Sequence, residues 1–486
     1  MKNLSPDNFL LYKQNSNAKA IITSSINYTF AELREKVFQR ASILIAQNIT
    51  SGDFVGIIGK NDVDFVIDVL ALWQLAAVPV PINTKLNNTD IEEQLTLANC
   101  DSFIVREEYG ELVTNKKRNL ISSNAFKVEL HTEYKTEINL SDSAVIIFTS
   151  GSTNKSKGIV LSFGSLYNSA LNSNQLLRYT HSDRWLASLP FYHIGGFSTI
   201  TRSLVFGIPL IIPDSLSVEH LLDSIHKYQP TFISLVSAQL KKIVDESISP
   251  NPELKNCLIG GGFSDIKLIK AAYELGWPVN LVYGSTETSS FVTALLKDEI
   301  MIKPNSVGRA VPTNKINIID DEGNELKPFE VGEIAVQTNS LMKGYLNPEE
   351  TSLVVRDGFY HTGDIGYLDE DGYLFLEGRK NYLISSGGEN VNPVEIENAL
   401  LSHPDISEAA VFPLKDEKWG EIIAAVAVLK KNAPDLSYEE IKLFLQENLA
   451  AFKIPKKIFF EEQLPKTELG KVQKEKLIDR YRLTSL

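Results

Sequence analysis

The chain has 486 residues, of which 43% are hydrophobic, 22% charged and 9% aromatic, and its formal net charge is −13. This ordinary composition excludes a disordered, collagen-like or disulfide-scaffold chain, and the length predicts about three domains. Because an acidic surface repels phosphate backbones and anionic lipids, we expect neither nucleic-acid binding nor membrane insertion. Cys100 and Cys257 lie far apart without metal-ligand spacing, which fits a cytoplasmic protein in a reducing compartment.

The first third of the chain has an α/β pattern. Thr29 and Glu32 have the spacing of a capping box, and the apolar residues behind them recur every three or four positions, as on one helix face. Residues 53–59 form a short apolar run typical of a buried parallel strand, and residues 64–75 and 78–82 predict a helix and a further strand. This strand-helix-strand order favours a doubly wound sheet.

The middle of the chain continues this pattern after a polar interval. At residues 101–141 we expect only short strands and loops, whereas residues 144–148 are an apolar strand that enters a Thr/Ser/Gly loop. A second α/β stretch runs from residue 186 to residue 283. Its expected strands are Pro209–Ile212, Phe232–Leu235, Cys257–Ile259 and Asn280–Val282.

Glycines punctuate short apolar runs at residues 308–377, which indicates a small β-rich subdomain. After residues 378–380 the pattern becomes a compact α+β one. The predicted fold class is therefore α/β, with a large N-terminal domain at 1–378 and a small mobile α+β C-terminal domain at 379–486. The large domain is expected to contain two doubly wound α/β subdomains and a small β-barrel. The C-terminal elements are expected at Pro393–Leu401, Ala409–Phe412, Ile422–Leu429 and Tyr438–Leu449.

The loop at residues 149–158 is the strongest local signal of chemistry. A strand delivers hydroxyls, glycine and two lysines into it, and backbone N–H groups, hydroxyls and lysine charge suit a polyphosphate. The spacing of a Walker A loop is absent. Taken alone, the segment fits a solvated Ser/Thr-rich turn equally well, so the remaining motifs decide.

Four further segments follow in order: Tyr283–Thr288 (YGSTET), Tyr360–Asp364 (YHTGD), Gly378–Lys380 (GRK) and Pro465–Lys471 (PKTELGK). With the first loop they make the chain similar, over nearly its whole length, to the adenylate-forming superfamily of acyl-CoA synthetases, luciferases and non-ribosomal adenylation domains. The resemblance implies that ATP activates a carboxylate as an acyl-adenylate with release of pyrophosphate. The acyl group then passes to a thiol, usually that of CoA, and AMP leaves.

The resemblance also implies a nucleotide site. Thr286 is expected to bond an α-phosphate oxygen, and Glu287 to hold Mg²⁺, a hard cation that prefers oxygen ligands. Lys471 is expected to bridge the reacting carboxylate and the α-phosphate. The expected catalytic residues are thus Lys471, Thr286, Glu287 and Lys157. The expected ATP- and AMP-binding residues also include Thr149, Ser150, Gly151, Ser152 and Thr153 at the phosphates, Gly261, Gly262, Tyr283 and Gly284 around adenine, and Asp364 and Arg379 at the ribose.

The acyl substrate is expected near His193 and Arg202, beside Gly260 and Gly261. The His-x-x-Gly-x₅-Arg pattern resembles the o-succinylbenzoate–CoA ligases of menaquinone synthesis, whose substrate has a second carboxylate for the arginine to bind. By the same resemblance, CoA lies along Ser386, Gly387 and Gly388, and Asn381 is the hinge of the mobile domain.

Two positions in the phosphate loop depart from the family pattern: Asn154 replaces a glycine and Ser156 a proline. They motivate a remote alternative, a non-catalytic nucleotide-binding protein. A nearer alternative is another small aryl- or acyl-CoA ligase, in which only the acyl pocket differs. The sequence leaves open whether the acceptor is CoA or a carrier-protein thiol, and whether the chain forms a homo-oligomer.

Overall fold

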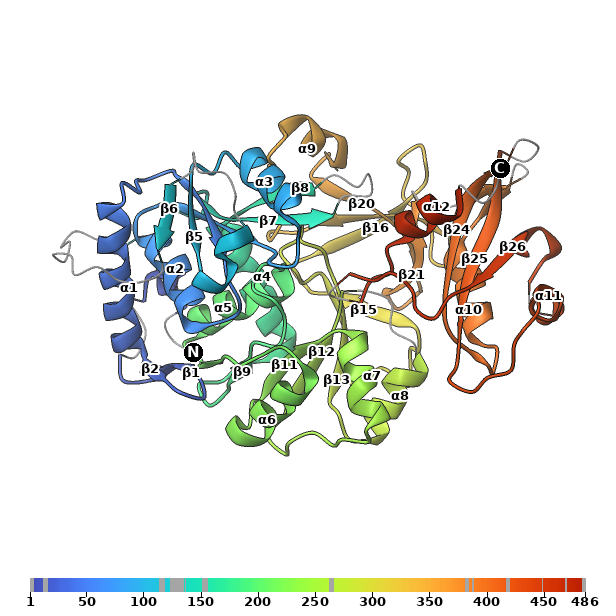
Figure 1. The fold of residues 1–486 in the computed structure, drawn as a ribbon, viewed down its shortest axis with the longest axis horizontal. Helices are drawn as coiled ribbons and strands as arrows, with labels where there is room; N and C mark the ends of the chain where they lie inside the picture. The colour runs from blue at the N-terminus through green and yellow to red at the C-terminus, as the bar shows by residue number, and fades with distance from the viewer. Residues whose placement is uncertain are drawn as a thin grey trace. The chain divides into compact units, whose positions relative to one another are not determined.

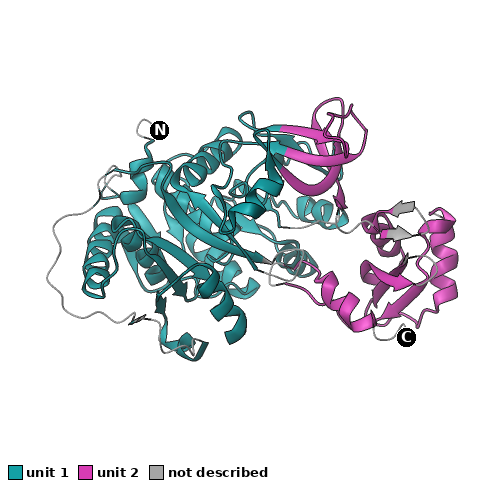
Figure 2. Cartoon of the chain, turned by 90° about the horizontal axis from the view of Figure 1, so that it is seen from above, with its two compact units in different colours: residues 1–315, 336–360 teal, residues 316–335, 361–486 magenta. Residues whose placement is uncertain are grey.

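The computed structural model describes residues 4–11, 16–112, 119–122, 135, 137–150, 156–261, 266–380, 384–386, 389–416, 420–447, 449–467 and 470–482. The chain divides into two compact units (Figure 2): unit 1 comprises residues 1–315 and 336–360, and unit 2 comprises residues 316–335 and 361–486. This division follows compactness alone, so the expected domain boundary at residue 379 stays a prediction. No helix in the described part of the chain is long and apolar enough to cross a membrane.

The N-terminal part of unit 1 folds as its hydrophobic pattern predicts. Thr29 caps the first long helix, its side chain accepting from the Glu32 N–H at 3.2 Å while the Glu32 carboxylate accepts from the Thr29 N–H at 2.8 Å. Parallel strands follow in the order β4-β3-β5-β6. The elements are η1 (Pro6–Leu10), α1 (Phe30–Ala46), β3 (Phe54–Ile58), α2 (Val63–Gln74), β4 (Val78–Ile82), α3 (Asn88–Leu97), β5 (Ser102–Val105), η2 (Glu107–Leu112) and β6 (Asn119–Ser122).

A second sheet of unit 1 has the order β15-β14-β13-β12-β11-β9-β10-β1-β2, and β9 to β13 are parallel (Figure 1). The four strands expected from residue 209 to residue 282 are confirmed. Because β11, β12 and β13 are parallel, their carboxyl ends meet at one edge of the sheet. The elements are β1 (Lys19–Ile22), β2 (Asn27–Thr29), β9 (Trp185–Leu186), α5 (Ile194–Phe206), β10 (Leu210–Ile211), α6 (Val218–Tyr228), β11 (Phe232–Leu235), α7 (Ser237–Asp245), β12 (Asn256–Ile259), α8 (Ile266–Glu274), β13 (Val279–Tyr283), β14 (Thr293–Leu295) and β15 (Ser306–Ala310).

A small antiparallel sheet of order β18-β8-β7 completes unit 1. Its β7–β8 hairpin is the strand-loop unit expected at residues 144–158. The helix α9, inside the stretch expected to be β-rich, was not predicted. The elements are β7 (Ser143–Ser150), β8 (Ser156–Ser162), α4 (Phe163–Leu177), β18 (Gly344–Tyr345), α9 (Pro348–Val354) and β19 (Val355–Arg356).

An aromatic core joins these parts of unit 1. Trp73 of α2 donates its indole N–H to the Ala144 carbonyl of β7 at 2.7 Å. The Trp73 ring packs edge to face against the rings of Phe9, Phe163 and Phe197, whose centroids lie 5.2 to 6.2 Å from its own. All four rings are almost fully buried. Because Phe197 belongs to α5, this cluster fixes α5 and the β7–β8 hairpin against the same core.

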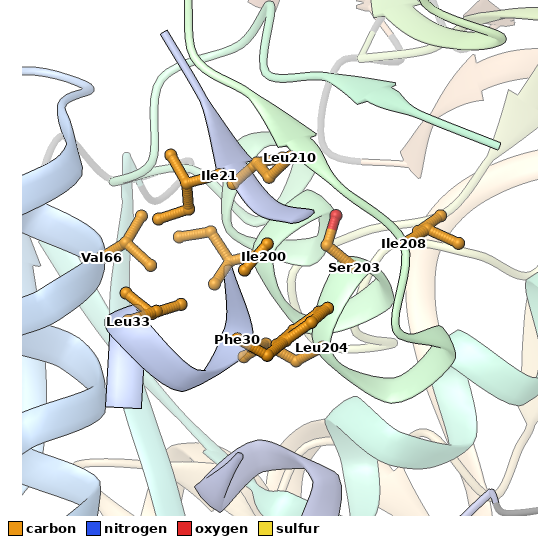
Figure 3. Close-up of a pocket in the computed structure, with 10 residues that line it drawn as sticks. Ile21, Phe30, Leu33, Val66, Ile200, Ser203, Leu204, Ile208 and Leu210 are labelled. Atoms are coloured by element: carbon orange, nitrogen blue, oxygen red, sulfur yellow. The ribbon is translucent and has the colours of Figure 1, made fainter. Parts of the chain in front are cut away.

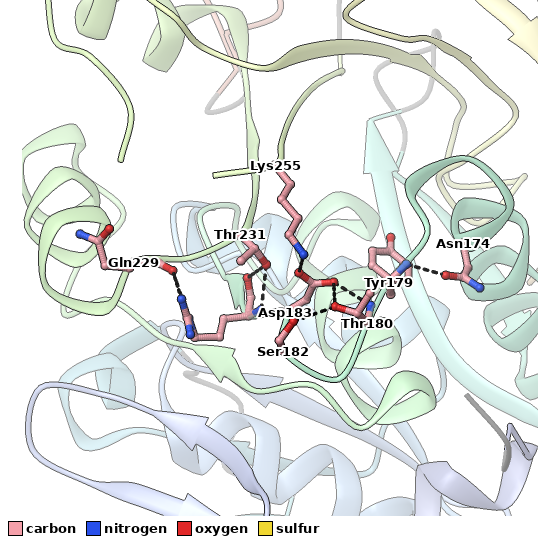
Figure 4. Close-up of polar contacts among 9 residues, drawn as sticks. Asn174, Tyr179, Thr180, Ser182, Asp183, Gln229, Thr231 and Lys255 are labelled. Carbon is pink, nitrogen blue, oxygen red and sulfur yellow. Dashed lines mark hydrogen bonds and ion pairs between the residues drawn. The ribbon is translucent and has the colours of Figure 1, made fainter. Parts of the chain in front are cut away.

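Polar contacts hold the start of β9 (Figure 4). The fully buried Asp183 carboxylate accepts from the Thr180 N–H at 2.7 Å and lies 2.6 Å from the Lys255 ammonium. Arg184 Nη2 donates to the Gln229 carbonyl at 2.7 Å. Burial alone would raise the pKa of Asp183, but the hydrogen bonds from Lys255 and Thr180 outweigh it and lower the pKa. The carboxylate therefore stabilises the native state in its charged form.

A small apolar cavity lies where α5 crosses β1, α1 and α2 (Figure 3). The Ser203 hydroxyl is buried beside it and has no hydrogen-bond partner among the described residues. A buried hydroxyl without a partner costs stability. The apolar lining includes Ile21, Phe30, Leu33, Val66, Ile200 and Leu204.

Unit 2 contains strands in the order β16-β17-β20-β21 and a separate α+β sheet of order β23-β22-β25-β24, with β26 beside β25. The helix expected at residues 393–401 is confirmed, and that expected at 438–449 ends at residue 446. The elements are β16 (Lys315–Ile319), β17 (Gly332–Gln337), β20 (Phe359–Leu368), β21 (Tyr373–Arg379), β22 (Ile384–Ser386), β23 (Glu389–Val391), α10 (Pro393–Leu401), β24 (Ile406–Asp416), β25 (Gly420–Leu429), α11 (Tyr438–Gln446), η4 (Ala451–Lys453), β26 (Lys457–Phe460) and α12 (Lys474–Arg482).

Candidate active site

The carboxyl edge of the second sheet of unit 1 carries the predicted glycines. Gly260 and Gly261 follow β12, and Gly284 follows β13, which pairs with β12 in parallel. Gly261 has φ +86°, a conformation that side chains rarely adopt. A Cβ on Gly284 would lie 2.1 Å from the Ser290 carbonyl oxygen. Glycine is therefore required at position 284 because the turn brings the Ser290 backbone against it.

The turn after Gly284 presents Thr286 and Glu287. The Thr288 hydroxyl accepts from the Ser285 N–H at 3.0 Å, and the Ser290 N–H donates to the Ser285 carbonyl at 2.9 Å. Ser290 has φ +96°, so the chain reverses sharply. Thr286 is buried within this turn. Its position is thus set by bonds inside the turn before any ligand binds.

Glu287 and Lys157 are brought close by a residue that the sequence did not single out. Tyr345 donates its hydroxyl to Glu287 Oε1 at 2.9 Å, and the Lys157 ammonium lies 5.1 Å from the centre of the Tyr345 ring. The ammonium also lies 2.7 Å from a carboxylate oxygen of Glu350 on α9. Burial, then the charge of Glu287 and the bond to it, raises the pKa of Tyr345.

The phosphate hairpin is described up to both ends of its loop. Thr149 is opposite Lys157 and Ser150 opposite Ser156 in antiparallel register. The Ser156 hydroxyl, at the position where the family has proline, accepts from Gln94 Nε2 at 3.1 Å, which ties the hairpin to α3. The loop itself, with Gly151, Ser152, Thr153 and Asn154, lies outside the described residues, as does Gly262.

The residues present fit a magnesium ion held mainly by a nucleotide. No group of three or more His, Cys, Asp or Glu side chains in the described part of the chain could hold a metal by itself. Glu287 Oε1 is bonded to Tyr345, while Oε2 has no protein donor among the described residues. Mg²⁺ commonly takes one or two carboxylates and completes its shell with phosphates and water. A single oriented carboxylate is therefore a suitable donor.

The helix α5 carries both predicted acyl-site residues. His193 is its N-cap residue, half-buried, with its ring 4.8 Å from that of Tyr192. Arg202 lies farther along the same helix and is 2% exposed. Its guanidinium is 5.3 Å from the Trp185 ring centre and 5.8 Å from that of Phe291.

Arg202 is a buried cation without an acidic partner. Its Nη2 lies 3.4 Å from the Ser290 hydroxyl, a long bond, and Nε has no hydrogen-bond partner in the described part of the chain. No carboxylate among the described residues forms an ion pair with it. Burial lowers the pKa of Arg202, although the neighbouring Tyr179 acts in the opposite direction. The aromatic faces attract the charge, but they replace only part of its lost hydration.

Unit 2 brings two of its predicted residues together. Asp364 of β20 is opposite Arg379 of β21, and Arg379 Nε donates to Asp364 Oδ1 at 2.7 Å. Near the C-terminus, the Lys471 N–H donates to the Thr467 hydroxyl at 3.1 Å, and the Lys471 side chain is exposed. Ser386 ends β22, while Gly387, Gly388 and the expected hinge Asn381 lie outside the described residues.

Sequence reasoning missed Tyr345, Glu350 and Ser290. Ser290 is the second residue after the YGSTET motif, so its place beside the site could have been expected from position alone. No local pattern distinguishes Tyr345 or Glu350 from ordinary core and surface residues. Their contacts depend on the pairing of β18 with β8, which lie far apart in the sequence.

Comparison with known proteins identifies the class of enzyme to which this site belongs. The sequence model of the AMP-binding enzyme family matches residues 11–346, and that of the AMP-binding enzyme C-terminal domain matches residues 395–471. The chain belongs to the AMP-binding enzyme family.

Similar members of the family include 2-succinylbenzoate–CoA ligases. The chain is 35% identical over 453 residues to the 2-succinylbenzoate–CoA ligase of Geobacillus sp. (strain WCH70), and the match covers 92% of both chains. The o-succinylbenzoate CoA synthetase (MenE) of Bacillus subtilis in complex with the acyl-adenylate intermediate OSB-AMP has a TM-score of 0.89, with 33% identity and 97% of both chains covered. The same enzyme with ATP and magnesium ion has a TM-score of 0.88, with 32% identity and 97% and 99% covered.

Proposed function

We propose that the chain is an ATP-dependent ligase that converts 2-succinylbenzoate, ATP and CoA into 2-succinylbenzoyl-CoA, AMP and pyrophosphate. The relatives with this name are similar over more than nine-tenths of the chain. Within the molecule, the assignment of the substrate is supported by Arg202, a buried guanidinium with no carboxylate partner among the described residues. A substrate with a second carboxylate supplies that partner.

In the first half-reaction, a carboxylate oxygen of the acid attacks the α-phosphorus of ATP, and the bond from this phosphorus to the bridging oxygen of pyrophosphate breaks. Two anions must approach, so rate enhancement rests on position and positive charge. By the family resemblance, we expect Thr286 to donate to an α-phosphate oxygen and Lys157 to neutralise the terminal phosphates. Mg²⁺, when bound at Glu287, supplies charge neutralisation across the phosphates.

In the second half-reaction, the CoA thiol loses its proton to solvent and its sulfur attacks the acyl carbon. The bond from this carbon to the phosphate oxygen of AMP breaks, and AMP leaves. The roles of Asp364 and Arg379 at the ribose, of Lys471 at the α-phosphate and of Ser386 beside CoA stay predictions from the resemblance. The Asp364–Arg379 pair is consistent with the first of these, because one carboxylate can accept from both a guanidinium and a hydroxyl.

ATP–pyrophosphate exchange with a panel of acids tests the proposal. We expect exchange with 2-succinylbenzoate and formation of AMP and a thioester once CoA is added. Benzoate and succinate, each representing one half of the substrate, serve as comparison acids. Exchange with another acid but not with 2-succinylbenzoate favours a different acyl-CoA ligase. Binding of ATP without exchange for any acid favours a non-catalytic nucleotide-binding protein.

A further inference from the structure

Two charged groups with separate roles in the proposed reaction are in contact with one aromatic residue. Glu287 Oε1 accepts from the Tyr345 hydroxyl at 2.9 Å, and the Lys157 ammonium lies 5.1 Å from the centre of the Tyr345 ring. Tyr345 is 9% exposed, so most of its side chain is shielded from water. One rigid side chain therefore touches both the expected metal ligand and the expected phosphate ligand.

The backbone around Tyr345 explains why its ring is fixed. In β18, Gly344 pairs with Val160 and Tyr345 with Ile159 of β8, and the Leu346 N–H donates to the Gly158 carbonyl at 2.9 Å. Lys157 precedes Ile159 by two residues on β8. The register therefore places Tyr345 diagonally opposite Lys157, with both side chains on the same face of the sheet. The strand β18 thus carries Tyr345 to the base of the phosphate hairpin.

Two further bonds hold the same arrangement. The Tyr345 N–H donates to the Thr351 hydroxyl at 2.8 Å, which joins β18 to α9. The Met342 N–H donates to the Glu287 carbonyl at 2.6 Å, which joins the segment before β18 to the turn that carries Glu287. Glu350 of α9 completes the group by its ion pair with Lys157 at 2.7 Å.

We propose that Tyr345 is a positioning residue that orients the Glu287 carboxylate for Mg²⁺ through its hydroxyl and holds the Lys157 ammonium on β8 through its ring face. This inference rests on the proposed function and deepens it. A hydrogen bond to one carboxylate oxygen leaves the other oxygen for a metal and removes rotational freedom that binding must otherwise restrict. The ring provides an uncharged surface for the ammonium, so that the donors not engaged by Glu350 stay available for phosphate.

The two contacts of Tyr345 can be separated by substitution. Tyr345→Phe removes the hydroxyl and keeps the ring, whereas Tyr345→Leu removes both. Calorimetric titration of the full chain with ATP, at a series of Mg²⁺ concentrations and in EDTA, measures binding without turnover. The quantity compared is the Mg²⁺ concentration at which ATP affinity has gained half of its metal-induced increase. For Tyr345→Phe we expect this concentration to rise about 10-fold. The affinity in EDTA should stay that of the parent chain.

Tyr345→Leu should also weaken ATP binding in EDTA, because Lys157 loses its ring. The control is Tyr438→Phe, which removes a hydroxyl bonded to the Pro455 carbonyl at 3.1 Å in unit 2 and should leave both readouts unchanged. Melting temperatures confirm that each variant is folded.

A parent chain that binds no ATP with or without Mg²⁺ contradicts the proposed function. If the parent chain binds ATP in a Mg²⁺-dependent way but Tyr345→Phe titrates like it, the inference about Tyr345 is wrong. Equal loss of affinity with Mg²⁺ and in EDTA for Tyr345→Phe also overturns it, since this pattern indicates a general structural role.

Discussion

Arg202 offers the sharpest test of what the acyl site recognises. Its guanidinium is 2% exposed and is surrounded by Trp185, Phe291 and the Ser290 hydroxyl, with no carboxylate paired to it in the described part of the chain. A hydrogen bond to a charged group contributes about 1.5–3 kcal/mol. Arg202→Ala should therefore lower kcat/KM for 2-succinylbenzoate by about 10–150-fold. Arg202→Met, which fills more of the space, should lose a similar amount.

The discriminating assay compares two acids in the same variant. For benzoate, which lacks the second carboxylate, we expect little change in kcat/KM if it reacts at all. Arg202→Lys should recover only part of the loss for 2-succinylbenzoate, because a point charge cannot reproduce a bidentate fork. The control is Arg184→Met, which removes an arginine bonded to the Gln229 carbonyl instead of a substrate. Equal losses for acids with one and two carboxylates would make Arg202 structural and refute the reasoning.

Three further predictions concern the lysine near the C-terminus and the stability of the fold. Lys471→Ala should slow adenylate formation by several orders of magnitude while thioester formation from supplied acyl-adenylate survives; equal loss in both half-reactions would contradict a role confined to the first. Asp183→Asn should lower the urea midpoint at pH 7. Because the folded pKa of Asp183 is lowered, its contribution is present above about pH 4 and is lost as pH falls through the folded pKa, so the two midpoints should converge as the solution is made more acidic. Ser203→Ala should raise the free energy of unfolding by about 1 kcal/mol, because it removes a hydroxyl without a partner among the described residues. The Ser173 hydroxyl donates to the Ala170 carbonyl at 2.8 Å, so Ser173→Ala should lower the free energy of unfolding. A decrease for both variants would show that the Ser203 hydroxyl is satisfied.

Local chemistry made much of the fold predictable. The Thr29–Glu32 capping box starts a helix through bonds among neighbours in the sequence, and α1 begins at Phe30, directly after Thr29. Short, mostly apolar runs between turn signals, such as residues 78–82 and 232–235, are typical of buried strands, and both strands occur at the predicted bounds. The helix at 393–401 begins with proline in its first turn, a position that suits it.

The motifs were predictable for a related reason. Each is a short segment whose residue types suit one ligand group, so their order along the chain identified the superfamily without any knowledge of distances. That order could also indicate that Asp364 and Arg379 belong to one site, and the register of β20 with β21 places them opposite each other. It could not determine what surrounds each side chain.

Only the tertiary structure decided the partners of the charged groups. Glu287 and Tyr345 are 58 residues apart, and Arg202 and Ser290 are 88 apart, so neither contact has a local signature. Strand pairing settles the first, because a shift of one residue in the register of β18 on β8 would turn Tyr345 to the other face of the sheet. The contact between Arg202 and Ser290 depends on burial. From the sequence, an arginine in an apolar helix could be a surface residue or a ligand-binding residue, and only packing shows that water is removed from it. The sequence thus determines which chemical groups the protein contains. Long-range packing determines which charged side chains, such as Arg202, have no carboxylate partner among the described residues and can pair with a substrate.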